Sequence, residues 1–222
     1  MFTKNSIAAA LTLITMSAAQ AGSIVSAVDA TVLSGGPGIG DIADTYNLFG
    51  LYTDYVSGVT DFDAYFATNP LHDLDYVGQE WFSNEGTTSA VVSYDLGKVQ
   101  SIQGMALWNE DGSGAGKLNI LGSTNGTSWF NLLSNLSPTD NTYEDLYKAD
   151  IFSWQSVDLR YVKLELSACP QSQPVNKVFT SCGIGEVAFN TGVTPAVPEM
   201  NPVAMGALGL GLMAVGLRRR QR

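Results

Sequence analysis

The sequence predicts an all-β fold, an antiparallel β-sandwich, from three observations. Short runs rich in β-branched and aromatic residues recur through the middle of the chain, and clusters of Gly, Asn and Ser separate them. One run, RYVKLEL (160–166), alternates strictly: Val162, Leu164 and Leu166 are apolar, and Tyr, Lys and Glu stand between them. Short strands joined by polar turns are typical of antiparallel sandwiches.

Six runs are expected to form the strands of this sandwich. The turn clusters NEDGSGAG (109–116) and STNGTSW (123–129) supply the Gly and Asn that hairpin turns need. The stretch 41–72 is aromatic and aperiodic, and we expect it to mix short helix with loop. The expected strands are 87–97, 99–109, 116–124, 128–133, 160–168 and 183–190.

The first 21 residues have the order of a secretory signal peptide. Lys4 lies in a short polar start, an apolar core follows over residues 7–16, and the small-residue triplet AQA (19–21) completes the pattern. The alternative is a buried N-terminal helix, which does not explain this order. We expect cleavage after Ala21, so that the mature chain begins at Gly22.

The chain ends in an apolar run, 202–217, closed by arginines. Asn201 suits a helix N-cap and Pro202 the first helical position. Sixteen residues make a helix of about 24 Å, which is marginal against a hydrocarbon core about 30 Å thick. The alternative, a buried core helix, is disfavoured by the terminal charges. These are expected to act as a membrane stop on the cytoplasmic side, and they are Arg218, Arg219, Arg220 and Arg222.

This tail, 202–222, together with the linker before it, 191–201, resembles the PEP-CTERM sorting signal. The resemblance rests on Val197-Pro198-Glu199, one apolar helix and a terminal Arg cluster, with Met200 where the usual motif has a second proline. The family occurs in Gram-negative bacteria that secrete exopolysaccharide, and its tail is cut by an exosortase in the inner membrane, as a GPI tail is removed after serving as an address. The resemblance implies an inner-membrane anchor, and a cell-surface or extracellular protein once the tail is cleaved.

Without its two ends the chain is strongly acidic. Residues 22–198 hold six of the eleven basic residues and twenty of the twenty-one acidic ones, a net charge of −14. Such a domain is repelled by nucleic acid and by anionic lipid, and it attracts divalent cations.

The two cysteines, Cys169 and Cys182, fall in the exported part of the chain. An even pair in an oxidising compartment indicates a disulfide. The alternative, a metal site, would need further ligands nearby, and the sequence offers none. The disulfide would close a 14-residue loop and contribute about 3 kcal/mol by loop-closure arguments.

Four segments in order resemble the discoidin, or coagulation factor V/VIII C-type, domain. They are EWFSNEGTTSAVVSYDLGKVQSIQGMALWNED (80–111), LNILGSTNGTSWFNL (118–132), RYVKLEL and GIGEVAF (183–189). The resemblance covers roughly residues 70–190 and implies a galactose-binding-like jelly roll, which we expect to occupy residues 22–190. Residues 22–70 match nothing in the family core, and the cysteine pair does not join the two ends of the domain as it does in the family.

Sequence motifs of catalysis are absent, and we expect no enzyme. His72 is the only histidine, so a nucleophile–base pair has one possible base. We interpret it as an exposed or hydrogen-bonded loop residue. The segment GGPGIGD (35–41) lacks the Lys and Ser/Thr of a phosphate loop, and no G-x-S-x-G elbow occurs. The many carboxylates leave a glycosidase open on counting alone.

Calcium is the expected cofactor, as a structural ion. Asp73 and Asp75 precede Trp81, where the discoidin resemblance implies an Asp-containing loop, and Glu186 lies in the closing strand, where some relatives supply a carboxylate. Oxygen ligands from one loop and one distant Glu suit Ca²⁺. Asp61 and Asp63 form a second candidate. The alternative is that all of these are solvated surface acids.

Polysaccharide is the expected ligand. The resemblance implies that it binds on loops at one end of the sandwich, in 72–85, 109–116 and 136–148, with Tyr76, Asn109, Glu110 and Asp111 as candidate contacts. Trp81, Trp108 and Trp129 are expected to pack in the core or at a hairpin base.

Three functions follow as hypotheses. The first is an exported polysaccharide-binding module at the cell surface, with exosortase as its processing partner. The second is a structural matrix protein with no specific ligand. The third, a glycan hydrolase, has the least support, because no catalytic motif accompanies the fold.

Overall fold

The computed structural model describes residues 22–74, 78–171 and 180–192, all within one compact unit, Ala21–Val193. The predicted signal peptide, sorting motif and C-terminal helix lie outside these residues. Neither helix in the described ranges has the length and hydrophobicity of a membrane span.

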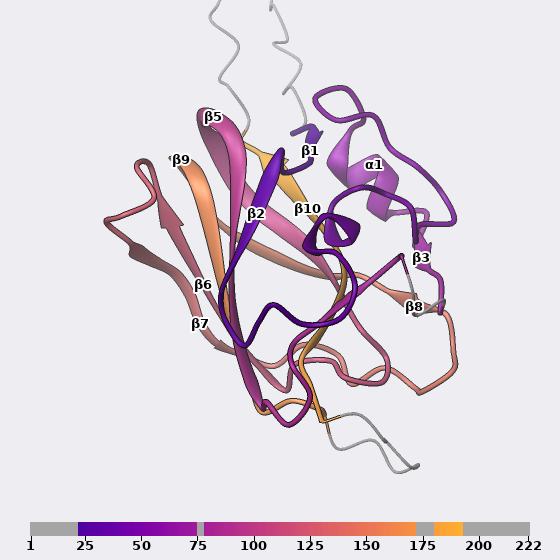
Figure 1. Ribbon diagram of the computed structural model, residues 1–222. Coiled ribbons are helices and arrows are strands. Elements are labelled where there is room, and N and C mark those ends of the chain that lie inside the picture. Colours follow the sequence, from indigo (N-terminus) through magenta and orange to yellow (C-terminus); the bar gives the residue numbers. More distant parts are fainter. Residues whose placement is uncertain (1–21, 75–77, 172–179, 193–222) are drawn as a thin grey trace, which may run out of the picture. The chain divides into compact units, whose positions relative to one another are not determined.

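The described part of the chain is built almost entirely of antiparallel strands, with one 3-10 helix, η1 (Ile42–Thr45), and one short α-helix, α1 (Phe62–Phe66) (Figure 1). This confirms the predicted all-β, antiparallel jelly-roll sandwich. The strands are β1 (Ile24–Val25), β2 (Asp29–Ser34), β3 (Leu71–His72), β4 (Trp81–Phe82), β5 (Ser89–Asn109), β6 (Lys117–Ser123), β7 (Phe130–Leu136), β8 (Tyr147–Lys148), β9 (Asp150–Ser167) and β10 (Gly183–Thr191).

Two long strands, β5 and β9, belong to both layers of the sandwich. The first half of β5 pairs with β2 and with the second half of β9, and β6 and β7 continue that layer. The second half of β5 pairs with β10, which in turn pairs with β1 and β4. In Figure 1, β6 and β7 lie at the left edge and β10 lies to the right.

The expected strands 87–97 and 99–109 are therefore one strand, β5, and not two. Gly97 has a positive φ of 81°, and the β5–β9 register shifts between Asp95 and Gln100. The glycine bends the strand into the second layer without ending it, as at a bulge. The expected strand 160–168 likewise begins earlier, because β9 starts at Asp150.

The main core fills the space between the layers. In β9, Val162, Leu164 and Leu166 are buried and the residues between them are half-exposed, as the alternation predicts. Trp81 also lies in this core, and its indole nitrogen donates to the carbonyl of Pro37. Trp129, by contrast, is half-exposed beneath the ammonium of Lys163.

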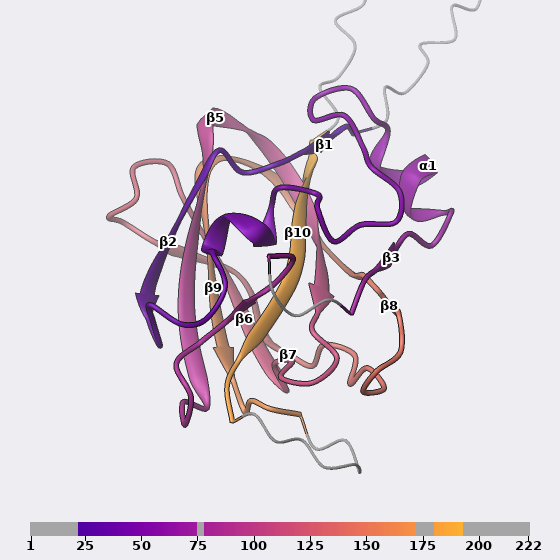
Figure 2. The same cartoon turned by 45° about the vertical axis from the view of Figure 1, so that its right-hand side comes forward.

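A second core explains the role of the N-terminal segment. Strand β10 is buried on both faces: Val187 and Phe189 face the main core, whereas Ala188 packs with Trp108 against the segment that carries Tyr55 and Phe62. The stretch 41–72, which does mix short helix with loop, covers this outer face, and α1 and β3 lie on that side in Figure 2. Its aromatic residues Tyr55, Phe62 and Tyr65 therefore serve packing, whereas Phe49 and Tyr52 stay exposed.

The predicted disulfide is present. Cys169, just after β9, bonds Cys182, just before β10, and both are buried in the main core. The bond ties the end of one layer-crossing strand to the strand that closes the other layer.

Candidate functional site

A small sheet at one side of the sandwich organises the candidate site. Strand β3 pairs with β8, matching His72 with Tyr147, and Leu51 bridges to His72. Leu51, His72 and Tyr147 are all buried. They form a row across three chain segments that faces inward, because side chains opposite one another in a sheet share a face.

Tyr147 lies at the centre of a buried hydrogen-bond network. Its hydroxyl donates to the carboxylate of Glu80, and His72 Nδ1 lies 3.0 Å from the same hydroxyl oxygen and 2.9 Å from the carbonyl oxygen of Asp73. Both neighbours of Nδ1 can accept, so the geometry assigns the imidazole proton to Nδ1. The chain of donation runs from His72 through Tyr147 to Glu80.

Burial keeps both His72 and Tyr147 neutral at neutral pH. Burial lowers the pKa of His72 to about 4, outweighing the hydrogen bond and charge of Asp73 and the charge of Asp111. Burial, followed by the charges of Glu80 and Glu110, raises the pKa of Tyr147 well above its usual value. A neutral imidazole bonded to a neutral phenol is a structural element, so His72 is hydrogen-bonded as expected. It lies in a buried strand, however, and not in the exposed loop that the sequence suggested.

Three buried carboxylates meet beside Tyr147. Glu80, Glu110 and Asp111 each offer an oxygen within 4.8 Å of the other two. Glu110 accepts from the backbone N–H of Gly112 at 2.8 Å and from that of Ser113. Burial, then its hydrogen bond to Asp111 and the charge of Glu80, raises the pKa of Glu110 well above the usual range. The group can share a proton, and its oxygens are of the type that hold a hard cation.

The predicted ligand contacts at the end of β5 lie beneath the surface. Asn109, Glu110 and Asp111 are all buried. The Asn109 amide donates to the carbonyls of Ala115 and Thr139 and to Gln171, and its oxygen accepts from Ala115. The side chain therefore connects three parts of the chain, at Ala115, Thr139 and Gln171.

Above these residues the segment 139–150 forms a pocket of about 640 Å³. Asn141 donates to the Asn109 carbonyl at 2.6 Å, the backbone N–H of Glu144 donates to Asp111 at 2.6 Å, and Asp150 accepts from both the backbone N–H and the hydroxyl of Thr139. The lining is mainly polar and comprises Thr139, Asn141, Thr142, Asp145, Leu146, Tyr147, Lys148, Ala149 and Asp150. The expected loop 136–148 is thus hydrogen-bonded, at Asn141 and Glu144, to the buried residues Asn109 and Asp111.

The three predicted calcium ligands have different surroundings. The side chain of Asp73 accepts from the backbone N–H of Leu74, and Asp75, like Tyr76, lies outside the described residues. Glu186 is fully buried: one carboxylate oxygen accepts from the backbone N–H of Leu48 at 3.3 Å, and the other has no hydrogen-bond partner among the described residues. Its charge acts on Tyr55, Tyr65 and Tyr94, and its backbone N–H donor lies in the segment 41–48. Neither Glu186 nor Asp73 belongs to the three-carboxylate group.

The pKa of Glu186 is raised well above the usual range. Burial is the main cause, and the charge of Asp44 adds to it, while the hydrogen bond from Leu48 opposes it. A buried carboxylate with a free oxygen fits either a proton or a cation. Asp61, from the second candidate pair, caps α1 by accepting from Ala64.

Sequence reasoning missed Glu80 and Tyr147 as site residues. They are separated by 67 positions, and no local pattern links them. The only signal was the one lone histidine, because a buried imidazole needs a hydrogen-bond partner.

Comparison with known proteins gives similarity to solved structures only. No protein-family model and no curated protein sequence matches the chain. The chain is similar to a chitosan-binding module from a chitosanase/glucanase of Paenibacillus sp. IK-5 (16% identity, 74% of this chain and 95% of that one, TM-score 0.47). It is also similar to the CBM32 of AlyQ in complex with 4,5-unsaturated mannuronic acid (14%, 75% and 96%, 0.44) and to a pectin-binding carbohydrate-binding module (21%, 54% and 75%, 0.39).

Proposed function

We propose that this protein is an exported polysaccharide-binding module whose binding site is the pocket in segment 139–150. The observation that carries the proposal is a polar pocket of about 640 Å³ whose loop is hydrogen-bonded to buried Asn109 and Asp111 and to half-buried Asp150. Its volume falls in the range of ligand sites. A loop fixed before the ligand arrives loses little conformational entropy on binding.

The proposal gives the module a binding role and no catalytic one. The single histidine is neutral and hydrogen-bonded, and both cysteines form the disulfide. Neither can act as the activated nucleophile or base of a hydrolase in this arrangement.

A pocket-filling substitution tests the proposal. Thr142 is exposed and lines the pocket, so Thr142→Trp should abolish retention in affinity gels that contain polysaccharide. Thr124→Trp, an exposed residue of the turn 123–129, is the matched control and should leave retention unchanged. Equal retention of both variants would place any binding elsewhere.

The second candidate is a structural matrix protein without a specific ligand. It is favoured by the burial of Asn109, Glu110 and Asp111, whose hydrogen bonds serve the fold itself. It predicts no retention of the parent protein on any polysaccharide gel.

The two ends of the chain support the export part of the proposal. The signal peptide directs the chain through the inner membrane, the apolar helix anchors it there, and an exosortase-type enzyme removes the PEP-CTERM-like tail to release the protein to the surface or matrix. Mass spectrometry of the mature C-terminus tests this route. A mature protein that still ends at Arg222 would contradict it.

A structural calcium ion is part of the proposal, with Glu186 as a ligand. The support is its buried carboxylate oxygen that lacks a hydrogen-bond partner among the described residues. Calcium at about 100 times its Kd would add about 2.7 kcal/mol to stability. Thermal melts with calcium and with chelator measure this shift, and identical midpoints would rule the ion out.

A further inference from the structure

We propose that the polysaccharide site continues from the pocket across the outer face of the small sheet to two exposed aromatic side chains, Tyr52 and Phe49. This extension rests on the proposed function, since it presupposes that the pocket binds a sugar. It makes the ligand a chain of several sugar units and not a single terminal residue.

The sheet register creates a continuous outer row. The backbone N–H of Tyr52 donates to the carbonyl of Leu71 at 3.0 Å, and Leu71 pairs with Lys148. Leu51, His72 and Tyr147 face inward, so Tyr52, Leu71 and Lys148 face outward. Lys148 also lines the pocket, which joins the row to the binding site.

The row is longer than one sugar ring. Neighbouring strands lie about 4.8 Å apart, so the backbones of Tyr52 and Lys148 are separated by about 10 Å. A ligand held in the pocket and also on Tyr52 must therefore span more than one ring.

The aromatic residues at the end of the row lie in a turn that hydrogen bonds hold in one conformation. The backbone N–H of Leu51 donates to the carbonyl of Leu48 at 3.0 Å, and the backbone N–H of Phe49 donates to the side chain of Asn47 at 2.9 Å. Gly50 lies against the ring of His72, where a Cβ atom would come within 2.2 Å of the imidazole. The turn therefore rests on the same buried network as the pocket.

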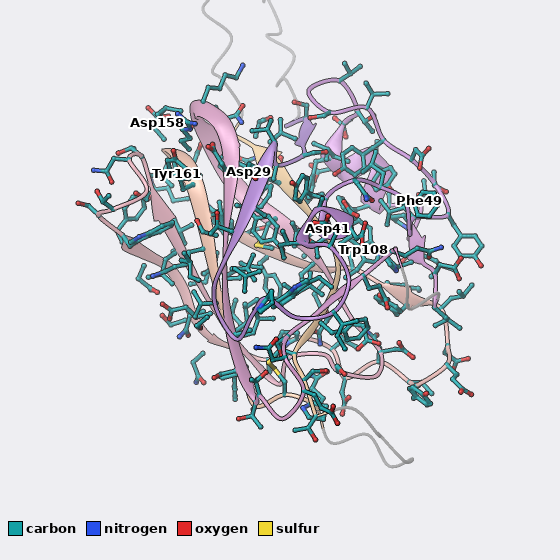
Figure 3. All side chains as sticks on the ribbon, viewed as in Figure 1. Asp29, Asp41, Phe49, Trp108, Asp158 and Tyr161 are labelled. Carbon is teal, nitrogen blue, oxygen red and sulfur yellow. A yellow bond between two sulfur atoms is a disulfide. The ribbon has the colours of Figure 1, made fainter. Side chains whose placement is uncertain are left out.

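Both aromatic side chains are exposed to solvent. Phe49 is 69% exposed and Tyr52 is 61% exposed, and Figure 3 shows Phe49 at the outer edge of the molecule on the side of β3 and β8. Rigid aromatic faces lose little entropy on binding. Their apolar surface suits the C–H faces of pyranose rings, which carry no charge.

The charges near the two aromatic residues determine which class of polysaccharide can bind. No Lys or Arg occurs between Lys4 and Lys98, so the segment that carries both aromatic residues is purely acidic, with Asp54 and Asp73 nearby in sequence. Lys148 is the one cation of the outer row. Because the rest of the segment is acidic, it repels uronate-rich or sulfated chains, and a neutral polysaccharide is the ligand class that fits.

Affinity as a function of chain length tests the extension. Neutral cello- and N-acetylated chito-oligosaccharides, from monomer to hexamer, are titrated calorimetrically against the mature protein, with oligomannuronate as the anionic arm. The parent protein should bind the neutral hexamers better than the dimers. Phe49→Ala/Tyr52→Ala should weaken hexamer binding roughly tenfold and leave the affinity for the shortest ligand that binds unchanged.

A second double variant controls for lost apolar surface. Val56 and Val59 are 61% and 74% exposed in the same segment but outside the row, so Val56→Ala/Val59→Ala should bind like the parent. Length-independent binding, binding of oligomannuronate only, or equal hexamer affinity in all three proteins would overturn the extension and leave the pocket in place. Absence of binding to all three series would overturn the pocket and the extension together.

Discussion

Tyr147 connects the buried network to the pocket, because its hydroxyl joins His72 to Glu80 while its residue lines the pocket. Tyr147→Phe leaves the carboxylate and the imidazole without this partner. Losing a buried hydrogen bond costs about 1–3 kcal/mol. We expect a loss of that size in urea unfolding, whereas exposed Tyr52→Phe should stay within about 0.5 kcal/mol of the parent. Equal stabilities would show that the network contributes nothing.

His72 makes stability depend on pH. Its pKa is about 4 in the folded protein and about 6.5 when unfolded. Between these values the unfolded state binds more protons, so the free energy of unfolding should fall by roughly 3 kcal/mol as the pH falls through this window.

Carboxylates titrate over the same pH range, so a variant must isolate the histidine. His72→Asn keeps an N–H near the position of Nδ1 but does not titrate. The difference in unfolding free energy between the parent and this variant, measured at several pH values, should change with pH by the predicted amount. A difference that does not change with pH would contradict the buried neutral histidine.

Glu186 makes the free energy of unfolding depend on pH in the opposite direction to His72. Its pKa is raised on folding, so its contribution is fully present below the unfolded pKa and is lost as the pH rises through the folded pKa. In calcium-free alkaline buffer Glu186→Gln should therefore be more stable than the parent. Added calcium should reverse this order, because the amide cannot replace the carboxylate as a ligand. If calcium stabilises both proteins equally, the ion binds elsewhere.

At the scale of elements, the disulfide joins the end of β9 to the start of β10. Cys169→Ala/Cys182→Ala should cost about 2–5 kcal/mol. Differential scanning calorimetry should show a lower midpoint, and reducing agent should lower the midpoint of the parent but not of the double variant. An unchanged midpoint on reduction would mean that strands β9 and β10 hold the loop closed without the bond.

The elements also show where local patterns mislead. The runs 87–97 and 99–109 are expected as two strands, yet they form one strand, β5, which continues through Gly97. The first strands, β1 and β2, were not predicted, because β1 has only two residues and β2 has no buried side to give an alternating pattern. Alternation in β9 was predicted correctly, since one side of that strand faces the core and the other faces solvent.

At the scale of the whole molecule, the domain carries a net charge of −14 over residues 22–198. Mutual repulsion opposes the compact state. Raising the ionic strength from about 0.01 M to about 1 M shortens the Debye length from about 30 Å to about 3 Å. The thermal midpoint should therefore rise with NaCl, and choline chloride should act alike. A response to sodium alone would point to a specific cation site.

The fold class, the disulfide and the acidic character can be predicted from the sequence, because they follow from local periodicity, from cysteine pairing in an oxidising compartment and from counting charges. The sequence also identified the loop 136–148 as a candidate binding region. The sequence motif at 109–111 suggested surface contacts. In the fold all three side chains are buried, and those of Asn109 and Asp111 are hydrogen-bonded to that loop.

Which distant residues meet becomes visible only in the folded chain. Glu80, Glu110 and Asp111 come together with Tyr147 and His72, and Tyr52 aligns with Lys148 through β3. These contacts depend on strand pairing between distant segments, such as His72 with Tyr147, which are 75 residues apart. The physical reason is that side-chain periodicity fixes which face a residue takes within its own strand, whereas the neighbour on that face is set by the register of another strand, which no local pattern encodes.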